Sequence, residues 1–328
     1  MSNSSQVARF VARRSVRVVI TVAVIAVLNF MLMQLAPGDA VDVLAGQAGV
    51  ADRDYLEEMR AKYGLDQPIP VQLVRYVSSL MTFDLGYSFR YQAPVLNLIL
   101  ERLPATLLLL VASLGIAVAV GVGSGAAAAR YYRRLPDRVL SFLALLFYAT
   151  PLFWFGLMLA MLFSVKLGWL PSSGLYTLGR EQSGLALVGD VAIHLIMPAL
   201  TLGVFYMAVY MRLVRTSMLD LYSMDFVRTA VAKGLSPRRI ANRHVLRNAI
   251  LPVVTIFGQQ FGTALGGAVV VEMVFAWPGL GTLAFDALFH RDLNLLLGIL
   301  FLSSIFVAIV NILVDLAYTR VDPRIRLE

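Results

Sequence analysis

Residues 225–252, which read DFVRTAVAKGLSPRRIANRHVLRNAILP, are a charged amphipathic stretch flanked on both sides by long apolar segments. The first part of this stretch, residues 225–233, is composed of residues compatible with a helix. Its apolar members Phe226, Ala230 and Ala232 recur near helical spacing. We therefore predict a short helix that begins close to the start of the stretch.

The same stretch also predicts where that helix ends and where a second one begins. Gly234 is suited to the left-handed conformation that ends many helices. Ser236 is a good N-cap, and Pro237 follows it at the first helical position. The pattern predicts two short helices joined by Gly-Leu-Ser.

The composition sets the class of protein around this stretch. Hydrophobic residues make up 59% of the 328 residues and charged residues 15%, and the mean hydropathy is +0.76. One soluble core could not bury so much apolar surface, so we expect an all-α polytopic membrane protein. The chain has no cysteine, which excludes disulfides and thiolate sites.

Six segments without Asp, Glu, Lys or Arg are long enough to cross about 30 Å of hydrocarbon. These expected transmembrane helices are 18–35, 103–129, 139–165, 191–211, 249–271 and 293–314. A basic start precedes the first segment, as in a signal peptide. The segment is long for a signal peptide and ends in a poor cleavage site, so we interpret it as an uncleaved span.

The distribution of basic residues predicts the orientation. Segments on one side of the spans hold 19 of the 28 Lys and Arg and six of the 20 acids. These segments are 1–17, 130–138, 212–248 and 315–328. The opposite segments, 36–102, 166–190 and 272–292, hold nine bases and fourteen acids. The positive-inside rule places both termini in the cytoplasm. It makes 36–102 an external domain, in which 54–63 and 71–81 have the pattern of short amphipathic helices.

The sequence offers no site for a fuel. None of Lys62, Lys166 and Lys233 lies in a phosphate-binding loop, so we expect no ATP bound by this chain. The spans carry His194 near an edge and nothing ionisable at a centre, which argues against an ion-coupled transporter.

Catalytic chemistry is equally sparse, and we predict no catalytic residue and no metal site. The three histidines, His194, His244 and His290, form no zinc-binding pair. Ser124 between two glycines suggests an intramembrane protease, but no deeply placed histidine is available as a base. Tight helix packing is the preferred interpretation of this serine.

The expected spans contain glycines, prolines and glutamines, and each of these needs an explanation in an apolar helix. Helix packing and kinks explain Gly258, Gly262, Gly266, Pro151, Pro198 and Pro252. A polar amide in hydrocarbon is costly unless it is bonded or faces water. Gln259 and Gln260 therefore either line a conduit or form an interhelical hydrogen bond.

Several short motifs resemble the permease subunits of ABC importers. They are Tyr63-Gly64-Leu65-Asp66 with Pro68, Asp84-Leu85-Gly86 with Ser88 and Pro94-Val95, Arg102 with Pro104 and Thr106, Arg228-Thr229-Ala230 with Lys233-Gly234, His244 with Leu246-Arg247-Asn248-Ala249 and Pro252, Glu272 with Phe275 and Trp277-Pro278-Gly279-Leu280-Gly281, Arg291-Asp292, and Asp322-Pro323-Arg324. The resemblance is to the dipeptide, oligopeptide and nickel permease family, in the member type with a long first external loop. It implies six transmembrane helices in a type I importer architecture.

The resemblance also implies roles for two loops. The family's cytoplasmic "EAA" loop docks on an ATPase subunit, which assigns ATPase coupling to Arg228, Thr229, Ala230, Lys233, Gly234, Leu235, Ser236 and Pro237. The sequence departs from the general pattern because Arg228-Thr229-Ala230 replaces Glu-Ala-Ala. An arginine at this position must instead pair with an acidic group or a carbonyl on the ATPase.

External loops of the family face a substrate-binding protein. This implies partner contact for Glu272, Trp277, Pro278 and Gly279. The alternative is an interfacial aromatic anchor followed by a turn, since tryptophan favours that depth.

The resemblance finally implies a complete transport machine. We expect a homologous second permease, two ABC ATPase subunits that use ATP and Mg, and an extracytoplasmic substrate-binding protein, in a bacterial cytoplasmic (inner) membrane. No nucleic acid is expected. The expected cargo is a di- or oligopeptide. The alternatives are nickel or another small solute and, from a different class, a stand-alone secondary transporter or channel.

Overall fold

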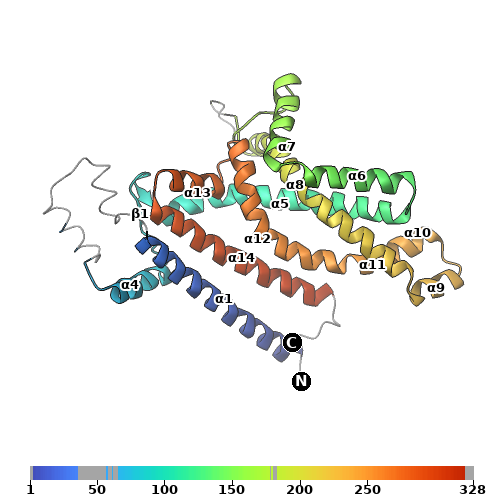
Figure 1. Ribbon diagram of the computed structural model, residues 1–328, viewed down its shortest axis with the longest axis horizontal. Helices are drawn as coiled ribbons and strands as arrows, with labels where there is room; N and C mark the ends of the chain where they lie inside the picture. Colours follow the sequence, from blue (N-terminus) through green and yellow to red (C-terminus); the bar gives the residue numbers. More distant parts are fainter. Residues whose placement is uncertain are drawn as a thin grey trace. The chain divides into compact units, whose positions relative to one another are not determined.

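A computed structural model describes residues 3–35, 57, 61, 66–177, 179 and 183–321 (Figure 1). The described chain is almost entirely helical, as expected. Its helices are α1 (Asn3–Leu35), α4 (Ile69–Met81), α5 (Val95–Arg130), α6 (Leu135–Ala149), α7 (Leu152–Leu159), η1 (Ala160–Lys166), α8 (Leu185–Tyr222), α9 (Asp225–Ala232), α10 (Pro237–Arg239), η2 (Ile240–Val245), α11 (Leu246–Ala249), α12 (Leu251–Val274), α13 (Leu280–Phe289) and α14 (Leu293–Val321). β1 (Tyr87–Ser88) and β2 (Ala93–Pro94) form an antiparallel pair.

Five of these helices are long and apolar enough to cross a membrane by themselves. They are α1, through its part Val18–Leu35, and α5, α8, α12 and α14. The expected span over 139–165 is not one straight helix. Its two halves, α6 and α7 with the π-helical η1, are bent by 104° around Pro151. Proline lacks the N–H that a continuous helix requires, and its ring clashes with the preceding turn.

The chain divides into two units. The first contains residues 1–102 and 283–309. In it α4 packs against α1, where the rings of Phe30 and Tyr76 lie 5.8 Å apart. The amphipathic helix expected over 71–81 is confirmed as α4. The other one, expected over 54–63, lies outside the described residues except for two isolated positions, as do the motifs at 63–65 and 322–324.

Side-chain hydrogen bonds connect distant parts of the first unit. The amide of Asn29 in α1 donates to the carbonyl of Leu297 in α14 (3.2 Å). The hydroxyl of Ser88 in β1 donates to Asp292, whose other oxygen accepts from the main-chain N–H of Leu295 (3.1 Å). Asp292 therefore caps the start of α14 and fixes the small hairpin to it.

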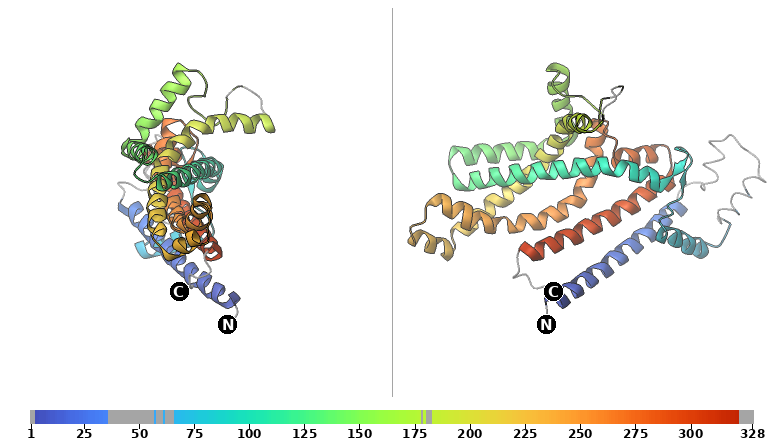
Figure 2. Two further views of the ribbon diagram at one scale, coloured as in Figure 1. Left: turned by 90° about the vertical axis from the view of Figure 1, so that its right-hand side faces the viewer. Right: turned by 180° about the vertical axis from the view of Figure 1, so that it is seen from behind.

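The second unit contains residues 103–282 and 310–326, and α8 is its central helix. The helices α6, α7, α11 and α12 all contact α8. The part of α5 that belongs to this unit runs antiparallel to α6, and a tight turn joins the two helices (Figure 2). Gly121 and Gly125 bring α5 so close to α8 that a methyl group at either position would lie 2.6 Å from an atom of that helix. Ser124 between them donates to the carbonyl of Gly121 (3.2 Å), a bond within its own helix.

The prediction that glycines in α12 allow close approach of another helix holds for one of the glycines described next and not for the other. A methyl group on Gly258 would lie 2.6 Å from Val314 of α14, so close approach is confirmed there. Gly266 has open space within 4 Å instead. Pro198 lies inside α8, and Pro252 lies at the start of α12, where a proline costs the helix no hydrogen bond.

Candidate functional site

The predicted helix pair begins with α9, which packs against η2. Val227 and Ala230 are the buried residues of α9, three positions apart on one face. Across from them Ile240 and Val245 of η2 are buried. The opposite face of α9 is exposed, so the helix is fixed on one side and free to contact a partner on the other.

The turn between the helices has the predicted geometry. Gly234 has φ +73°, and the N–H of Leu235 bonds back to the carbonyl of Ala230 (3.3 Å), as in a Schellman cap. Nothing lies within 4 Å of a methyl group placed on Gly234, so its conformation and not its size requires glycine. The hydroxyl of Ser236 accepts from the N–H of Arg239 (3.4 Å), and Pro237 is the first residue of α10.

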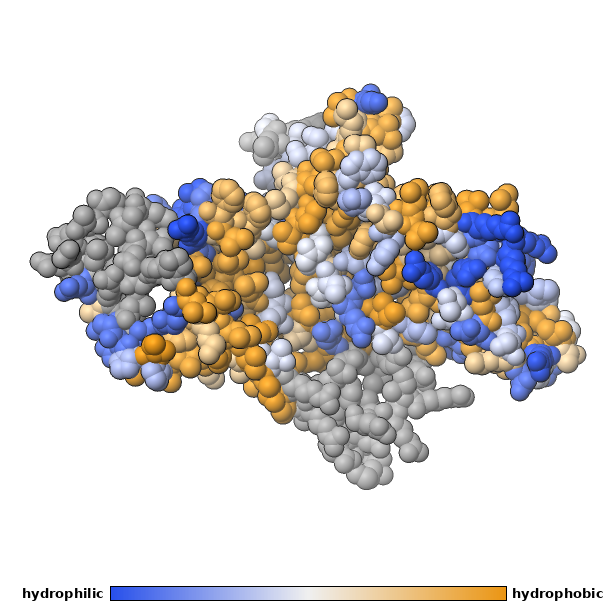
Figure 3. All heavy atoms as spheres, viewed as in Figure 1, coloured by the Kyte–Doolittle hydropathy of each residue, from blue (hydrophilic) through white to orange (hydrophobic). Residues whose placement is uncertain are grey.

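The exposed side of this turn is cationic. Arg228 approaches Asp225 at 3.4 Å, but the two side chains are 78% and 94% exposed, so the pair contributes little to stability. Thr229 bonds to the carbonyl of Asp225 within α9 (3.0 Å). Lys233 is exposed as well. Figure 3 shows hydrophilic residues gathered at the end of the second unit that carries α9 and α10.

The second helix of the pair does not end in a loop. It continues from α10 through η2 and α11, and Ile250 is the one residue between α11 and α12. The π-helical turns of η2 present its buried side chains to α9, and α11 packs on α8. The helix pair is therefore linked to α12 by helical segments and to α8 by the packing of α11.

A buried ion pair that the sequence pattern did not reveal braces the same end of the unit. Arg215 of α8 donates twice to Asp137 of α6, at 2.6 and 3.0 Å. Asp137 also accepts from the N–H of Arg133 (2.9 Å), whose φ of +63° turns the chain into α6. The guanidinium of Arg215 lies 5.4 Å from the ring of Tyr132. The sequence shows Asp137 as the one acid in a basic turn, but its partner Arg215 lies 78 residues away.

The residues expected to face an external partner are largely buried. Glu272 is 0% exposed: its carboxylate accepts from Thr106 (2.7 Å) and from the N–H groups of Gly281 (2.7 Å) and Thr282 (3.0 Å). Gly279 is required beside it, because a methyl group there would lie 2.1 Å from the carboxylate. A buried polar group is stable when it is hydrogen-bonded in this way.

Trp277 is also 0% exposed, and its indole N–H donates to the carbonyl of Ala105 (2.9 Å). The loop after α12 is thus pinned to the start of the apolar part of α5, whereas an interfacial anchor would leave the ring partly in the headgroup region. Pro278 is half-buried. Contact of this loop with another protein stays a prediction, and the buried side chains of Glu272 and Trp277 are not available for it in this structure.

The two amides of α12 differ in exposure. Gln259 is exposed and Gln260 half-buried, and the carbonyl of Gln260 accepts from Thr263 (3.0 Å). Their role in a conduit stays a prediction. Within the described residues no group of three or more His, Asp or Glu side chains is arranged to hold a metal ion.

Comparisons with known proteins agree on one family. The family described as "Binding-protein-dependent transport system inner membrane component" matches residues 119–327, and its N-terminal component matches residues 7–110. The oligopeptide transport system permease protein AppB of Bacillus subtilis (strain 168) is 39% identical over 321 residues, which are 97% of this chain and 99% of that protein.

Two further relatives extend the comparison. The di/tripeptide transport system permease protein DppB of Pseudomonas aeruginosa (strain UCBPP-PA14) is 39% identical over 332 residues, covering 97% of this chain and 98% of that protein. A chain of the inward-facing MetNI methionine ABC transporter, in its CY5 native crystal form, has a TM-score of 0.54 at 18% identity. That match covers 69% of this chain and 96% of the other, and supports the fold.

Proposed function

This chain belongs to the family of binding-protein-dependent transport system inner membrane components, and on that premise we propose that it forms half of a translocation pathway for di- or oligopeptides. It is a multi-pass permease subunit of an ABC importer. The observation that carries the peptide cargo is identity of 39% over nearly the whole chain to both an oligopeptide and a di/tripeptide permease.

The helix pair around Gly234 couples this pathway to ATP hydrolysis. Force from a separate ATPase must enter through a rigid body, and α9 is held against η2 by its buried face. The helical path from α10 to α12, interrupted only at Ile250, supplies the connection to the spans. The exposed cations Arg228 and Lys233 complement acidic groups or carbonyls on the ATPase.

The working complex contains more than this chain. A homologous second permease completes the pathway, two ABC ATPase subunits bind and hydrolyse ATP with Mg, and an extracytoplasmic binding protein delivers the cargo. The assembly is located in a bacterial cytoplasmic membrane. Selection of the cargo rests mainly with the binding protein.

The alternatives predict different behaviour. A nickel permease has no support from a ligand cluster in the described part of this chain. A stand-alone secondary transporter or channel would work without partners.

The test is reconstitution in proteoliposomes. The full complex is expected to accumulate a labelled peptide only with ATP and binding protein, and the purified chain alone is expected to be inert. Peptide uptake by the chain alone would exclude the proposal, as would ATP-dependent uptake of nickel but not of peptides by the complex.

A further inference from the structure

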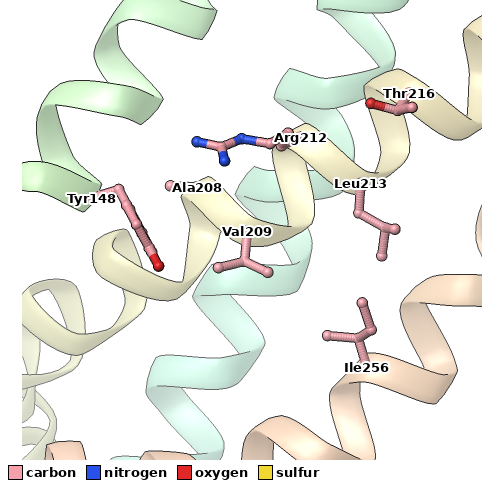
Figure 4. Close-up of a pocket in the computed structure, with 7 residues that line it drawn as sticks. All are labelled: Tyr148, Ala208, Val209, Arg212, Leu213, Thr216 and Ile256. Atoms are coloured by element: carbon pink, nitrogen blue, oxygen red, sulfur yellow. The ribbon is translucent and has the colours of Figure 1, made fainter.

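A cavity of about 400 Å³ lies in the second unit between α6, α8 and α12 (Figure 4). It is lined by Tyr148, Ala208, Val209, Arg212, Leu213, Thr216 and Ile256. Val209 and Leu213 point from α8 toward the side of Ile256, and Arg212 extends along α8 toward Tyr148. The lining is apolar with few polar groups, which is typical of sites for small ligands of this size.

The cation of this cavity, Arg212, is exposed and lies beside the exposed ring of Tyr148. The guanidinium of Arg212 is 5.9 Å from the centre of the Tyr148 ring. Tyr148 is nine residues past the start of the apolar segment 139–165, about 14 Å along a helix axis. Arg212 itself is the first residue of the basic segment 212–248, directly after the apolar segment 191–211.

Arg212 differs from its neighbour Arg215 in one decisive respect. Arg215 is neutralised by Asp137, whereas no acid pairs with Arg212 in the part of the chain that the structure describes. A ring face attracts a cation but leaves the N–H groups at the edge of the guanidinium free. The guanidinium of Arg212 is therefore available to an anionic group of a ligand.

We propose that this cavity binds the C-terminal carboxylate of a peptide in transit, with Arg212 as the group that receives it. This inference rests on the proposed function. A guanidinium matches a carboxylate with two parallel hydrogen bonds. The apolar remainder of the cavity makes no demand for hydrogen bonds, so it accepts peptides with different side chains.

The cavity is bounded by three helices of one unit, α6, α8 and α12, which suits a compact solute such as a short peptide. An anionic lipid headgroup offers a similar charge to Arg212, so the experiments distinguish the two ligands.

The first measurement uses the full complex in proteoliposomes. Arg212→Gln is expected to lower ATP-dependent uptake of a tripeptide with a free carboxylate by about tenfold, because a bidentate charged contact is lost. Arg212→Lys is expected to give an intermediate rate. Arg138→Gln, which removes an exposed arginine of α6 outside the cavity, is the matched control and is expected to transport like the parent. Basal ATP hydrolysis reports that each variant is assembled.

The second measurement needs no binding protein. The chain has no cysteine, so Leu213→Cys places its only thiol in the cavity lining. Alkylation of this thiol by a maleimide is expected to slow when the tripeptide is added, and not when its C-terminal amide is added. Combination with Arg212→Gln is expected to abolish the protection.

Each outcome decides a separate point. Parental uptake by Arg212→Gln, or equal protection by the acid and the amide, would overturn the carboxylate site. A defect of Arg212→Gln that appears only in vesicles with anionic lipid would assign the cavity to lipid instead. If the unmodified complex transports no peptide, the proposed function itself is wrong.

Discussion

Arg215 and Asp137 form two hydrogen bonds, of 2.6 and 3.0 Å, across 78 residues of sequence. The pair joins the turn before α6 to α8, and α8 leads directly to the coupling helix pair. Asp137 is buried, while the side chain of Arg215 is 27% exposed. The pair is therefore a brace for the unit that carries α9 and α10.

Breaking this brace is expected to destabilise the protein. Asp137→Asn leaves Arg215 without its counter-charge, and removing one partner of a largely buried pair costs about 3 kcal/mol. The apparent unfolding temperature of the purified complex is the measurement. Arg228→Gln is the matched control, because its partner Asp225 is exposed. Equal melting of both variants would show that the brace carries no stability.

Substitution of Gly234 is expected to uncouple transport from hydrolysis. Gly234→Val puts a β-branched residue at φ +73°, where a left-handed backbone costs a non-glycine residue about 1–2 kcal/mol. The turn then relaxes and changes the angle of α9. ATP hydrolysis should persist in the assembled complex while peptide uptake falls. Gly234→Asn, which tolerates this conformation, should retain most uptake; normal uptake by Gly234→Val would contradict the coupling role.

Gly279 is expected to tolerate no side chain. A methyl group there meets the Glu272 carboxylate at 2.1 Å, so Gly279→Ala forces apart a buried hydrogen-bond network, at about 3 kcal/mol. The yield and unfolding temperature of the complex should fall. Gly266→Ala in α12 is the control, because nothing lies within 4 Å of the added methyl group. A stable Gly279→Ala complex would mean that the network is not structural.

Docking of the binding protein is better tested at the end of α13 than in the loop 276–281. Deletion of that loop would remove Trp277 and unfold its surroundings. Phe289 is 77% exposed, and the preceding residue Leu288 is exposed too. Phe289→Ser should weaken binding-protein affinity severalfold without changing the unfolding temperature, since such a contact buries an aromatic anchor. Unchanged affinity in a surface-binding assay would show that α13 is not part of the interface with the binding protein.

Local signals predicted the coupling helix pair well because its geometry is set by neighbours in sequence. Gly234, Ser236 and Pro237 each act on the backbone within a few residues of themselves, through φ, a cap and a missing N–H. The apolar segments likewise predicted the spans from composition. Pro151 was recognised as a breaker, but the size of its bend depends on what packs around it.

Contacts between residues that are remote in the sequence could not be predicted. The family resemblance implied that Glu272 and Trp277 contact a partner. Their hydrogen-bond partners within the chain, Thr106 and Ala105, lie more than 160 residues earlier. Arg212 was counted only as one of the bases of the segment 212–248, because a side chain's direction along a helix is not part of a hydropathy pattern. Its neighbour Tyr148 is supplied by another span.

The sequence by itself determined a multi-span helical protein with two short helices around Gly234, because hydropathy, charge asymmetry and local caps act through the solvent and the nearest residues. Only the tertiary structure decided which charges are neutralised and which are free. Asp137 selects Arg215 and leaves Arg212 facing a cavity, and that choice depends on distances between helices that are remote in the chain.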